Sequence, residues 1–307
     1  MVKLDSAFAD YDLYSDFYEL VRQIPDGMVT TYGALARALG DVVAARACGY
    51  MLSINPDPVG TPCYKVVKSD GKVGKFTHPL GSEEKIRRLH DNGVSVENDA
   101  IVDFESRCFI DFKSDKPLER MKSEQEKMAS MVSLSDDFNT EEIAAVDVSY
   151  DDNFGYGVMV IERAGKLEKR FTKMETRFPY IPGYLSYREF KFIRELSEDF
   201  SGILLVDGNG YLHPRRIGLA SFAGLMLDIP TIGIAKSLLL GRKEGDWIYI
   251  GDTRSAYVLD RKYFVSPGHR IRLDSAVSLT ETKFNGKYPE LLKIAHKETV
   301  KLRNGLN

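Results

Sequence analysis

Two carboxylates stand inside or at the end of apolar segments in the second half of the chain. Asp147 interrupts the run IAAVDVSY, and Asp207 follows the run GILLV. A buried carboxylate is costly unless it is paired, is hydrogen-bonded or binds a metal ion. Oxygen ligands of this type suit Mg²⁺, which can activate water and support displacement at phosphorus. Capping by backbone donors is the alternative interpretation, but the recurrence in two separate segments favours a metal site.

The cysteines offer a second kind of chemistry. There are three, Cys48, Cys63 and Cys108, and they are widely spaced. An odd number without a CxxC pair argues against a disulfide framework and against a zinc site. A functional cysteine in this chain is therefore expected to act as a reactive thiol.

The composition indicates an ordinary globular protein with room for two domains. The chain has 307 residues, of which 43% are hydrophobic and 28% are charged, with a net charge of −3. No apolar run suits a membrane span, and the acidic N-terminus lacks the features of a signal peptide, so we expect a cytoplasmic protein with no membrane partner. Basic residues outnumber acidic ones within 60–90. That stretch could face a phosphate backbone, although a solvated surface patch explains it as well.

The first half of the chain predicts short helices. A helix over 14–24 stops at the breaker Ile24-Pro25-Asp26-Gly27, a second follows the N-cap Thr30-Thr31 and ends at Gly40, and a third covers 42–53. The second and third form a helix-turn-helix candidate, although helices of an ordinary core share this pattern. A polar, helix-like stretch over 111–140 then marks a boundary between domains at 1–110 and 111–307.

The second half alternates strands with helices. We expect strands over 143–150, 155–162, 169–177, 202–206 and 231–235, and helices over 186–199, 214–228 and 288–303. This alternation predicts a layered α/β domain, in which functional groups gather at the carboxyl ends of buried strands.

Five segments of the second half resemble the endonuclease V family in order and spacing, over about residues 113–305. They are VDVSY (146–150), FPYIPGYLSYRE (178–189), LLVDGNGYLHPRRIGLAS (204–221), IPTIGIAKS (229–237) and VSPGHR (265–270). The resemblance implies a ribonuclease H-like fold. It also implies nicking of DNA at the second phosphodiester bond 3′ to deoxyinosine or another deaminated base, with Mg²⁺ or Mn²⁺ as cofactor.

The same resemblance assigns residues to the site. Asp147, Glu189 and Asp207 match the metal-binding carboxylates, and His296 matches a position that completes the site. From spacing alone His296 could equally be a core histidine, because it shares a helix face with Leu292 and Val300. The resemblance also places Lys236 near the scissile phosphate or the metals, and His213 at a further active-site position.

A wedge and a lesion pocket are implied as well. The segment 179–182 resembles the family's wedge, in which two prolines stiffen the loop and Tyr180 could stack where a base has left. An ordinary Pro-Tyr turn is the alternative. Backbone around Gly183, Leu185 and Gly208 would line a pocket for flipped hypoxanthine. Asn209 departs from the His or Gln common at its position, beside the metal site.

Residues 14–95 resemble the mainly α, winged-helix-like active-site domain of O6-alkylguanine-DNA alkyltransferases, which uses no cofactor. The match implies that Cys63 accepts an alkyl group from a flipped guanine. Arg46 would replace the flipped base in the stack, Tyr32 would push the nucleotide out, and Asn55 would order the turn before the cysteine. The small side chains of the helix from Val42 would allow close approach to the minor groove.

This chain departs from the alkyltransferase motif Pro-Cys-His-Arg. Tyr64 and Lys65 replace the histidine and the arginine, Asn92 stands in place of a later glutamate, and Phe76 replaces a common tyrosine. The relay that activates the cysteine is therefore missing. Lys65 and the local positive charge could still lower the pKa of the thiol.

The sequence predicts a bifunctional DNA-repair enzyme that acts on double-stranded DNA carrying O6-alkylguanine or deaminated bases. The retained Cys63 favours alkyl transfer. In the alternative, the first domain only binds alkylated guanine, and the nuclease is the sole catalytic activity. A preference of the nuclease for inosine in RNA stays open as a third possibility.

Overall fold

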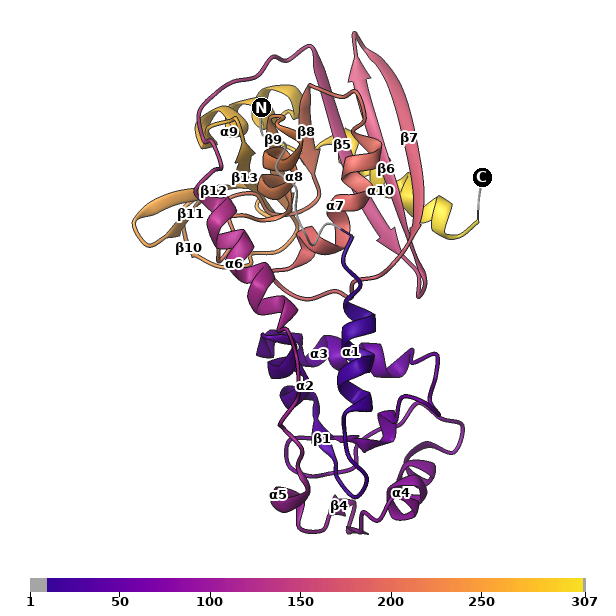
Figure 1. Cartoon of the computed structure of the whole chain (residues 1–307). Helices are drawn as coiled ribbons and strands as arrows, with labels where there is room; N and C mark the ends of the chain where they lie inside the picture. Colours follow the sequence, from indigo (N-terminus) through magenta and orange to yellow (C-terminus); the bar gives the residue numbers. More distant parts are fainter. Residues whose placement is uncertain (1–9, 306–307) are drawn as a thin grey trace. The chain divides into compact units, whose positions relative to one another are not determined.

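The computed structural model describes residues 10–305, and the chain divides into two compact units. Among the described residues, one unit contains 12–122 and 177–182, and the other contains 10–11, 123–176 and 183–305. Figure 1 shows the elements of both units, coloured along the sequence. Among residues 10–305, no helix is long and apolar enough to cross a membrane.

Three helices open the first unit: α1 (Leu13–Arg22), α2 (Tyr32–Leu39) and α3 (Ala45–Ser53). The predicted N-cap of α2 is confirmed, because the Thr31 hydroxyl accepts a hydrogen bond from the amide of Ala34 at 3.1 Å. The helix ends at Gly40 with a φ of +105°, a conformation that favours glycine. The third helix starts later than predicted, since residues Val42–Ala44 form a 3-10 turn, η1.

The rest of the first unit consists of short elements around a small core. These are η2 (Cys63–Lys65), α4 (Gly81–Asp91), α5 (Phe104–Arg107) and the two-stranded pairs β1 (Thr30–Thr31) with β2 (Val66–Val67) and β3 (Val96–Glu97) with β4 (Ala100–Ile101). The division between the units falls within α6 (Pro117–Ala129). The sequence did not predict α4, because its GSEEKIRRLHD stretch holds few apolar residues. The winged-helix assignment stays a prediction.

Nine strands form one mixed sheet in the described part of the second unit, in the order β10-β11-β12-β13-β9-β8-β5-β6-β7. Their bounds are β5 Glu142–Tyr150, β6 Phe154–Arg163, β7 Lys166–Glu175, β8 Ile203–Val206, β9 Thr231–Ala235, β10 Arg242–Glu244, β11 Trp247–Ile250, β12 Thr253–Leu259 and β13 Tyr263–His269. The central strands β5, β8 and β9 are parallel, and the outer strands pair antiparallel. The five predicted strands are confirmed as β5 to β9, whereas β10 to β13 were not predicted.

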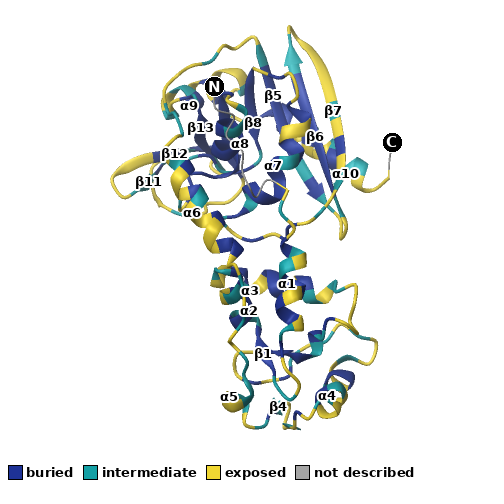
Figure 2. Cartoon of the chain, in the orientation of Figure 1, coloured by how far each residue is buried: buried dark blue, intermediate teal, exposed yellow. Residues whose placement is uncertain are grey.

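Helices cover both faces of this sheet. Figure 1 shows α7 (Leu185–Leu196) and α8 (Leu219–Leu227) in front of it and α10 (Glu290–Arg303) behind it, and α9 (Leu273–Phe284) packs on β12 and β13. Figure 2 shows the central strands buried and β7 exposed over most of its length. The layered α/β prediction is confirmed, and the ribonuclease H-like assignment stays a prediction. Alternation of side chains along β5 places Asp147 on the same face as Ile143 and Ala145, which pack in the core beneath α10.

Candidate functional site

Three carboxylates predicted as metal ligands come from different elements of the second unit. Asp147 lies on β5 and Glu189 on α7, and they are 8% and 9% exposed. Asp207 follows the last residue of β8, at the carboxyl end of a buried strand. The negative charge of Asp147 raises the pKa of both other carboxyls, so the structure brings all three into electrostatic contact.

Helix α10 holds Asp147 through two side chains. The Nδ1 of His296 and the Oγ1 of Thr299 each lie 3.0 Å from the same oxygen, Oδ2 of Asp147. His296 is thus an exposed partner of a carboxylate rather than a core histidine. The sequence analysis missed Thr299, although its position one helical turn after His296 could have pointed to it. Both bonds use the same oxygen, so α10 fixes the orientation of the Asp147 carboxylate.

Asp207 is paired with Lys236, the residue after β9. The Nζ of Lys236 donates a hydrogen bond to Oδ2 of Asp207. Burial raises the pKa of Asp207 to about 6, against the opposing effect of the Lys236 ammonium and with a further increase from Asp147. Burial is thus the main cause of the raised pKa, and the neighbouring Asp147 adds to it despite the lysine.

The pKa of Glu189 is raised further than that of Asp207. Burial, followed by the charge of Asp147, raises its pKa to about 8 even though the neighbouring Arg188 acts in the opposite direction. The Arg188 guanidinium carbon lies 3.8 Å from the centroid of the Tyr150 ring. A carboxyl with such a pKa is largely protonated at neutral pH unless a cation is present to favour the charged form.

The donor set suits a hard divalent cation. All three carboxylates offer oxygen, the ligand atom preferred by Mg²⁺ and Mn²⁺. Within residues 10–305, no three Asp, Glu, His or Cys side chains are already gathered as a closed set of metal ligands. Lys236 occupies one oxygen of Asp207, and His296 occupies one of Asp147. A cation would compete with Lys236 for that oxygen of Asp207.

The glycines predicted to line the lesion pocket lie close to other side chains of the second unit. Gly183 has a φ of +82°, and a Cβ there would lie 2.9 Å from a terminal nitrogen of Arg215. Its carbonyl accepts hydrogen bonds from Arg215 and from the buried Gln125 of α6, and these two side chains bond each other at 2.7 Å. A Cβ added at Gly208 would lie 3.4 Å from Leu219 and 4.0 Å from Leu185. The sequence analysis missed Gln125.

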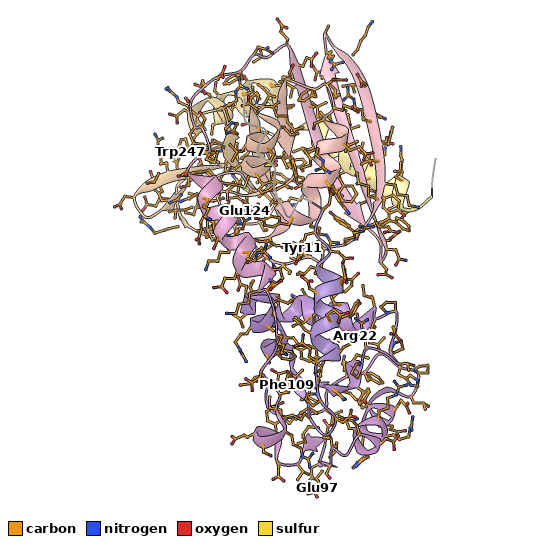
Figure 3. The ribbon with its side chains drawn as sticks, in the orientation of Figure 1. Tyr11, Arg22, Glu97, Phe109, Glu124 and Trp247 are labelled. Carbon is orange, nitrogen blue, oxygen red and sulfur yellow. The ribbon has the colours of Figure 1, made fainter. Side chains whose placement is uncertain are left out.

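Two further residues predicted for the nuclease site, Tyr180 and His213, differ in burial. Tyr180 is 62% exposed, as a stacking side chain requires. His213 is buried, and burial followed by the charge of Arg215 lowers its pKa to about 3, so the ring is neutral at pH 7. Figure 3 marks Glu124 on α6, which accepts a hydrogen bond from the Tyr187 hydroxyl on α7 at 2.8 Å. Helix α6 thus fixes the start of α7, the helix that carries Glu189.

In the first unit, Cys63 lines a small cavity of about 210 Å³ together with Tyr32, Gly49, Phe76 and Lys85. Cys63 itself is 8% exposed and begins the η2 turn. Asn55 spans the loop before it, because its side chain donates to the carbonyl of Thr61 at 3.0 Å. Arg46 is exposed on α3.

The substituted relay residues serve the fold. Lys65 is 3% exposed and its Nζ donates to the carbonyls of Ile24 and Pro25 and to Asp26. Asn92 donates to the same oxygen of Asp26 at 2.8 Å and accepts from the amide of Gly27. Both residues therefore fix the turn after α1. The expectation that Lys65 could lower the pKa of Cys63 finds no support in these contacts.

A different lysine is the buried cation beside Cys63. Lys85, on α4, is 1% exposed and donates to the carbonyls of Val66 and Val73, both at 2.6 Å. Burial lowers its pKa to about 8, and the charge of Cys63 acts in the opposite direction. The sequence analysis missed Lys85 because nothing in the pattern of α4 distinguishes it from a surface lysine.

Two family models each match one half of the chain, and several relatives match nearly all of it. The family model described as "Endonuclease V" matches residues 126–297, and the one described as "6-O-methylguanine DNA methyltransferase, DNA binding domain" matches residues 12–94. A protein of Picrophilus torridus named "Bifunctional methyltransferase/endonuclease" is 50% identical over 95% of this chain and 97% of its own length. The chain belongs to this family of bifunctional methyltransferase/endonucleases. Both predicted resemblances are confirmed.

Other relatives extend the comparison. A Thermoplasma volcanium protein with the same name is 46% identical over 95% of this chain and 91% of its own length. A Nanoarchaeum equitans relative, 31% identical over 94% of this chain and 90% of its own length, is named "Bifunctional methyltransferase-like/endonuclease". Among solved structures, Ciona intestinalis endonuclease V in complex with an inosine-containing 24mer DNA covers 63% of this chain and 100% of its own, with a TM-score of 0.55 and 25% identity.

Proposed function

We propose that the chain is a DNA-repair enzyme with two activities in one polypeptide. The second domain nicks DNA at the second phosphodiester bond 3′ to deoxyinosine and other deaminated bases, with Mg²⁺ or Mn²⁺. The first domain transfers an alkyl group from O6-alkylguanine to Cys63. The observation that carries the nuclease proposal is the gathering of Asp147, Glu189 and Asp207 from two strands and a helix into electrostatic contact, with His296 and Lys236 bonded to two of them. We keep the boundary between the two sequence domains near residue 110, whereas the compact units of the fold divide within α6.

In the nuclease domain, Asp147, Glu189 and Asp207 would hold the divalent cation. When bound, that cation would supply an activated water and stabilise charge at phosphorus. His296 and Thr299 fix the orientation of Asp147 through Oδ2. Lys236 would leave Asp207 and place its ammonium beside the scissile phosphate, where it offsets negative charge.

The lesion would be read by the segment that follows β7 and by the loop after β8. Tyr180 would stack against the base left without its partner. Gly183, Leu185 and Gly208 would line the pocket for flipped hypoxanthine, with backbone groups as the hydrogen-bonding partners. His213 would contribute as a neutral imidazole, because burial keeps its pKa low.

In the alkyltransferase domain, the Cys63 thiolate would attack the alkyl carbon after its proton has passed to water. The new S–C bond forms as the C–O6 bond breaks, and the electron pair stays on the guanine, which is then protonated. Lys85 would favour the thiolate as a buried cation in the same cavity. Tyr32, Arg46 and Asn55 would extrude the nucleotide, fill the stack and order the loop.

Nicking of a duplex with a single deoxyinosine tests the nuclease proposal. The wild-type chain with Mg²⁺ should cut the inosine strand at the second bond 3′ to the lesion, and Asp147→Ala should not. Two competitor substrates are added to the same reaction. One is a DNA strand with a ribonucleotide after the inosine, as in the Ciona complex, and the other is an RNA that contains inosine. Cutting of RNA alone would contradict the DNA assignment.

Transfer of label tests the first domain. Incubation with DNA that carries labelled O6-methylguanine should leave the label on the wild-type protein and not on Cys63→Ala. The name of the Nanoarchaeum relative and the missing histidine relay favour a second candidate function, in which this domain binds alkylated guanine without transfer. Retained binding without labelled protein would establish that alternative and exclude transfer.

A further inference from the structure

Tyr288 is a buried tyrosine next to the carboxylates that neither the motifs nor the proposed mechanism uses. It precedes Pro289, the N-cap residue of α10, and is 7% exposed. Its ring packs at 4.3 Å from that of Tyr263 on β13, with an angle of 34° between the planes. Its hydroxyl has no hydrogen-bond partner among residues 10–305. A buried donor without an acceptor is rare in native structures and calls for an explanation.

The hydroxyl lies within the electrostatic field of the candidate nuclease site. Burial raises the pKa of Tyr288, and the charges of Asp207 and then Asp147 raise it further. The Lys236 ammonium lies 5.9 Å from the centroid of the ring. Tyr288 is therefore protonated at neutral pH and offers a hydrogen-bond donor beside the carboxylates and Lys236.

An acceptor that arrives with the substrate would satisfy this hydroxyl. A water bound to a cation directs its protons outward and is a weak acceptor, whereas a phosphodiester oxygen can only accept. The neighbouring Lys236 is suited to the same anion. A hydroxyl held in a water-poor position before the substrate binds also needs little reorganisation when it donates.

We propose that Tyr288 donates a hydrogen bond to a non-bridging oxygen of the scissile phosphate. This inference rests on the proposed nuclease function and adds a substrate-contacting residue to it. In the free protein the unsatisfied hydroxyl destabilises the fold, because burial removes it from water without replacing the hydrogen bond. Stability and activity should therefore respond to its removal in opposite directions.

Tyr288→Phe removes the hydroxyl and keeps the ring that packs on Tyr263. Under single-turnover conditions with saturating Mg²⁺, nicking of the deoxyinosine duplex should fall roughly 10- to 100-fold, the range for one hydrogen bond to a charged oxygen. The thermal midpoint of the metal-free variant should equal or exceed that of the wild type. Tyr257→Phe is the matched control, because its hydroxyl bonds Glu281 on α9, away from the carboxylates. That variant should keep the wild-type nicking rate.

Two results would overturn the inference while leaving the nuclease function standing. Nicking by Tyr288→Phe within twofold of the wild type would show that the hydroxyl does not contact the reacting phosphate. A lower thermal midpoint together with slower nicking would assign the hydroxyl a structural role. Failure of the wild-type chain itself to nick the duplex would instead refute the proposed function.

Discussion

Replacing Glu189 with glutamine should stabilise the metal-free protein while it abolishes nicking. Glutamine has nearly the shape of the protonated glutamic acid, and burial with the charge of Asp147 raises the pKa of Glu189 from 4.5 to about 8. Between these two values the folded wild type keeps a proton that the unfolded chain has released. The free energy of unfolding therefore falls as the pH rises through this window.

The stability advantage of Glu189→Gln can be calculated from the difference between the two pKa values of Glu189. Each pH unit lowers the free energy of unfolding of the wild type by about 1.4 kcal/mol. Glutamine does not titrate, so the variant avoids this loss. Its advantage over the wild type should be near zero at pH 4.5, roughly 3 kcal/mol at pH 7 and at most about 5 kcal/mol above pH 8.

Urea denaturation in EDTA at several pH values measures this advantage. The chain has one tryptophan, Trp247 on β11, so its fluorescence reports the unit that contains Glu189 (Figure 3). Adding Mg²⁺ should stabilise the wild type at pH 8 more than it stabilises Glu189→Gln, since the variant keeps only two of the three charged ligands. An advantage that does not vary with pH, or a variant less stable than the wild type at pH 9, would refute the reasoning.

Three further substitutions test other contacts. Thr299→Val removes a hydrogen bond to Asp147 and should slow nicking about tenfold, whereas Thr299→Ser should keep most of the rate in the same assay. Gly40→Ala should lower the stability of the first unit by about 1–3 kcal/mol in calorimetry, because φ is +105° and a Cβ would lie 2.6 Å from the amide nitrogen of Glu119. Lys65→Met should lower the stability of the first unit in calorimetry, because it removes the hydrogen bonds to the carbonyls of Ile24 and Pro25 and leaves Asn92 as the partner of Asp26, with unchanged nicking at low temperature.

The sequence was sufficient to predict the central sheet and the origin of the carboxylates. The apolar runs IAAVDVSY and GILLV predict buried strands. Asp147 interrupts the first run, and Asp207 follows the second. Alternation along β5 determines which face carries Asp147, but not which helix covers that face. Thr299 and Tyr288 were therefore missed, because their roles depend on how α10 docks against the sheet. The hairpins β10 to β13 were missed because β10 is short and fully exposed and β13 contains a proline.

In the first domain, too, the sequence predicted which residues are unusual but not what they contact. The motif identified Cys63 and the substitutions around it, yet it could not show what the substituted residues do. Lys65 and Asn92 are far apart in the sequence and meet at Asp26, where they secure a turn. Lys85 became a candidate only when the fold placed it in the cavity with Cys63. Contacts between distant segments decide such roles, and a single sequence does not reveal them.

The most direct test of two sites in one chain is a single reaction on a duplex that carries labelled O6-methylguanine and, at a distance, deoxyinosine. Label on the protein and the length of the inosine strand are measured together. We predict both products from the wild type, labelled protein without a nick from Asp207→Ala, and a nick without labelled protein from Cys63→Ala. Loss of both products in either variant, or the absence of one of them from the wild type, would contradict the account.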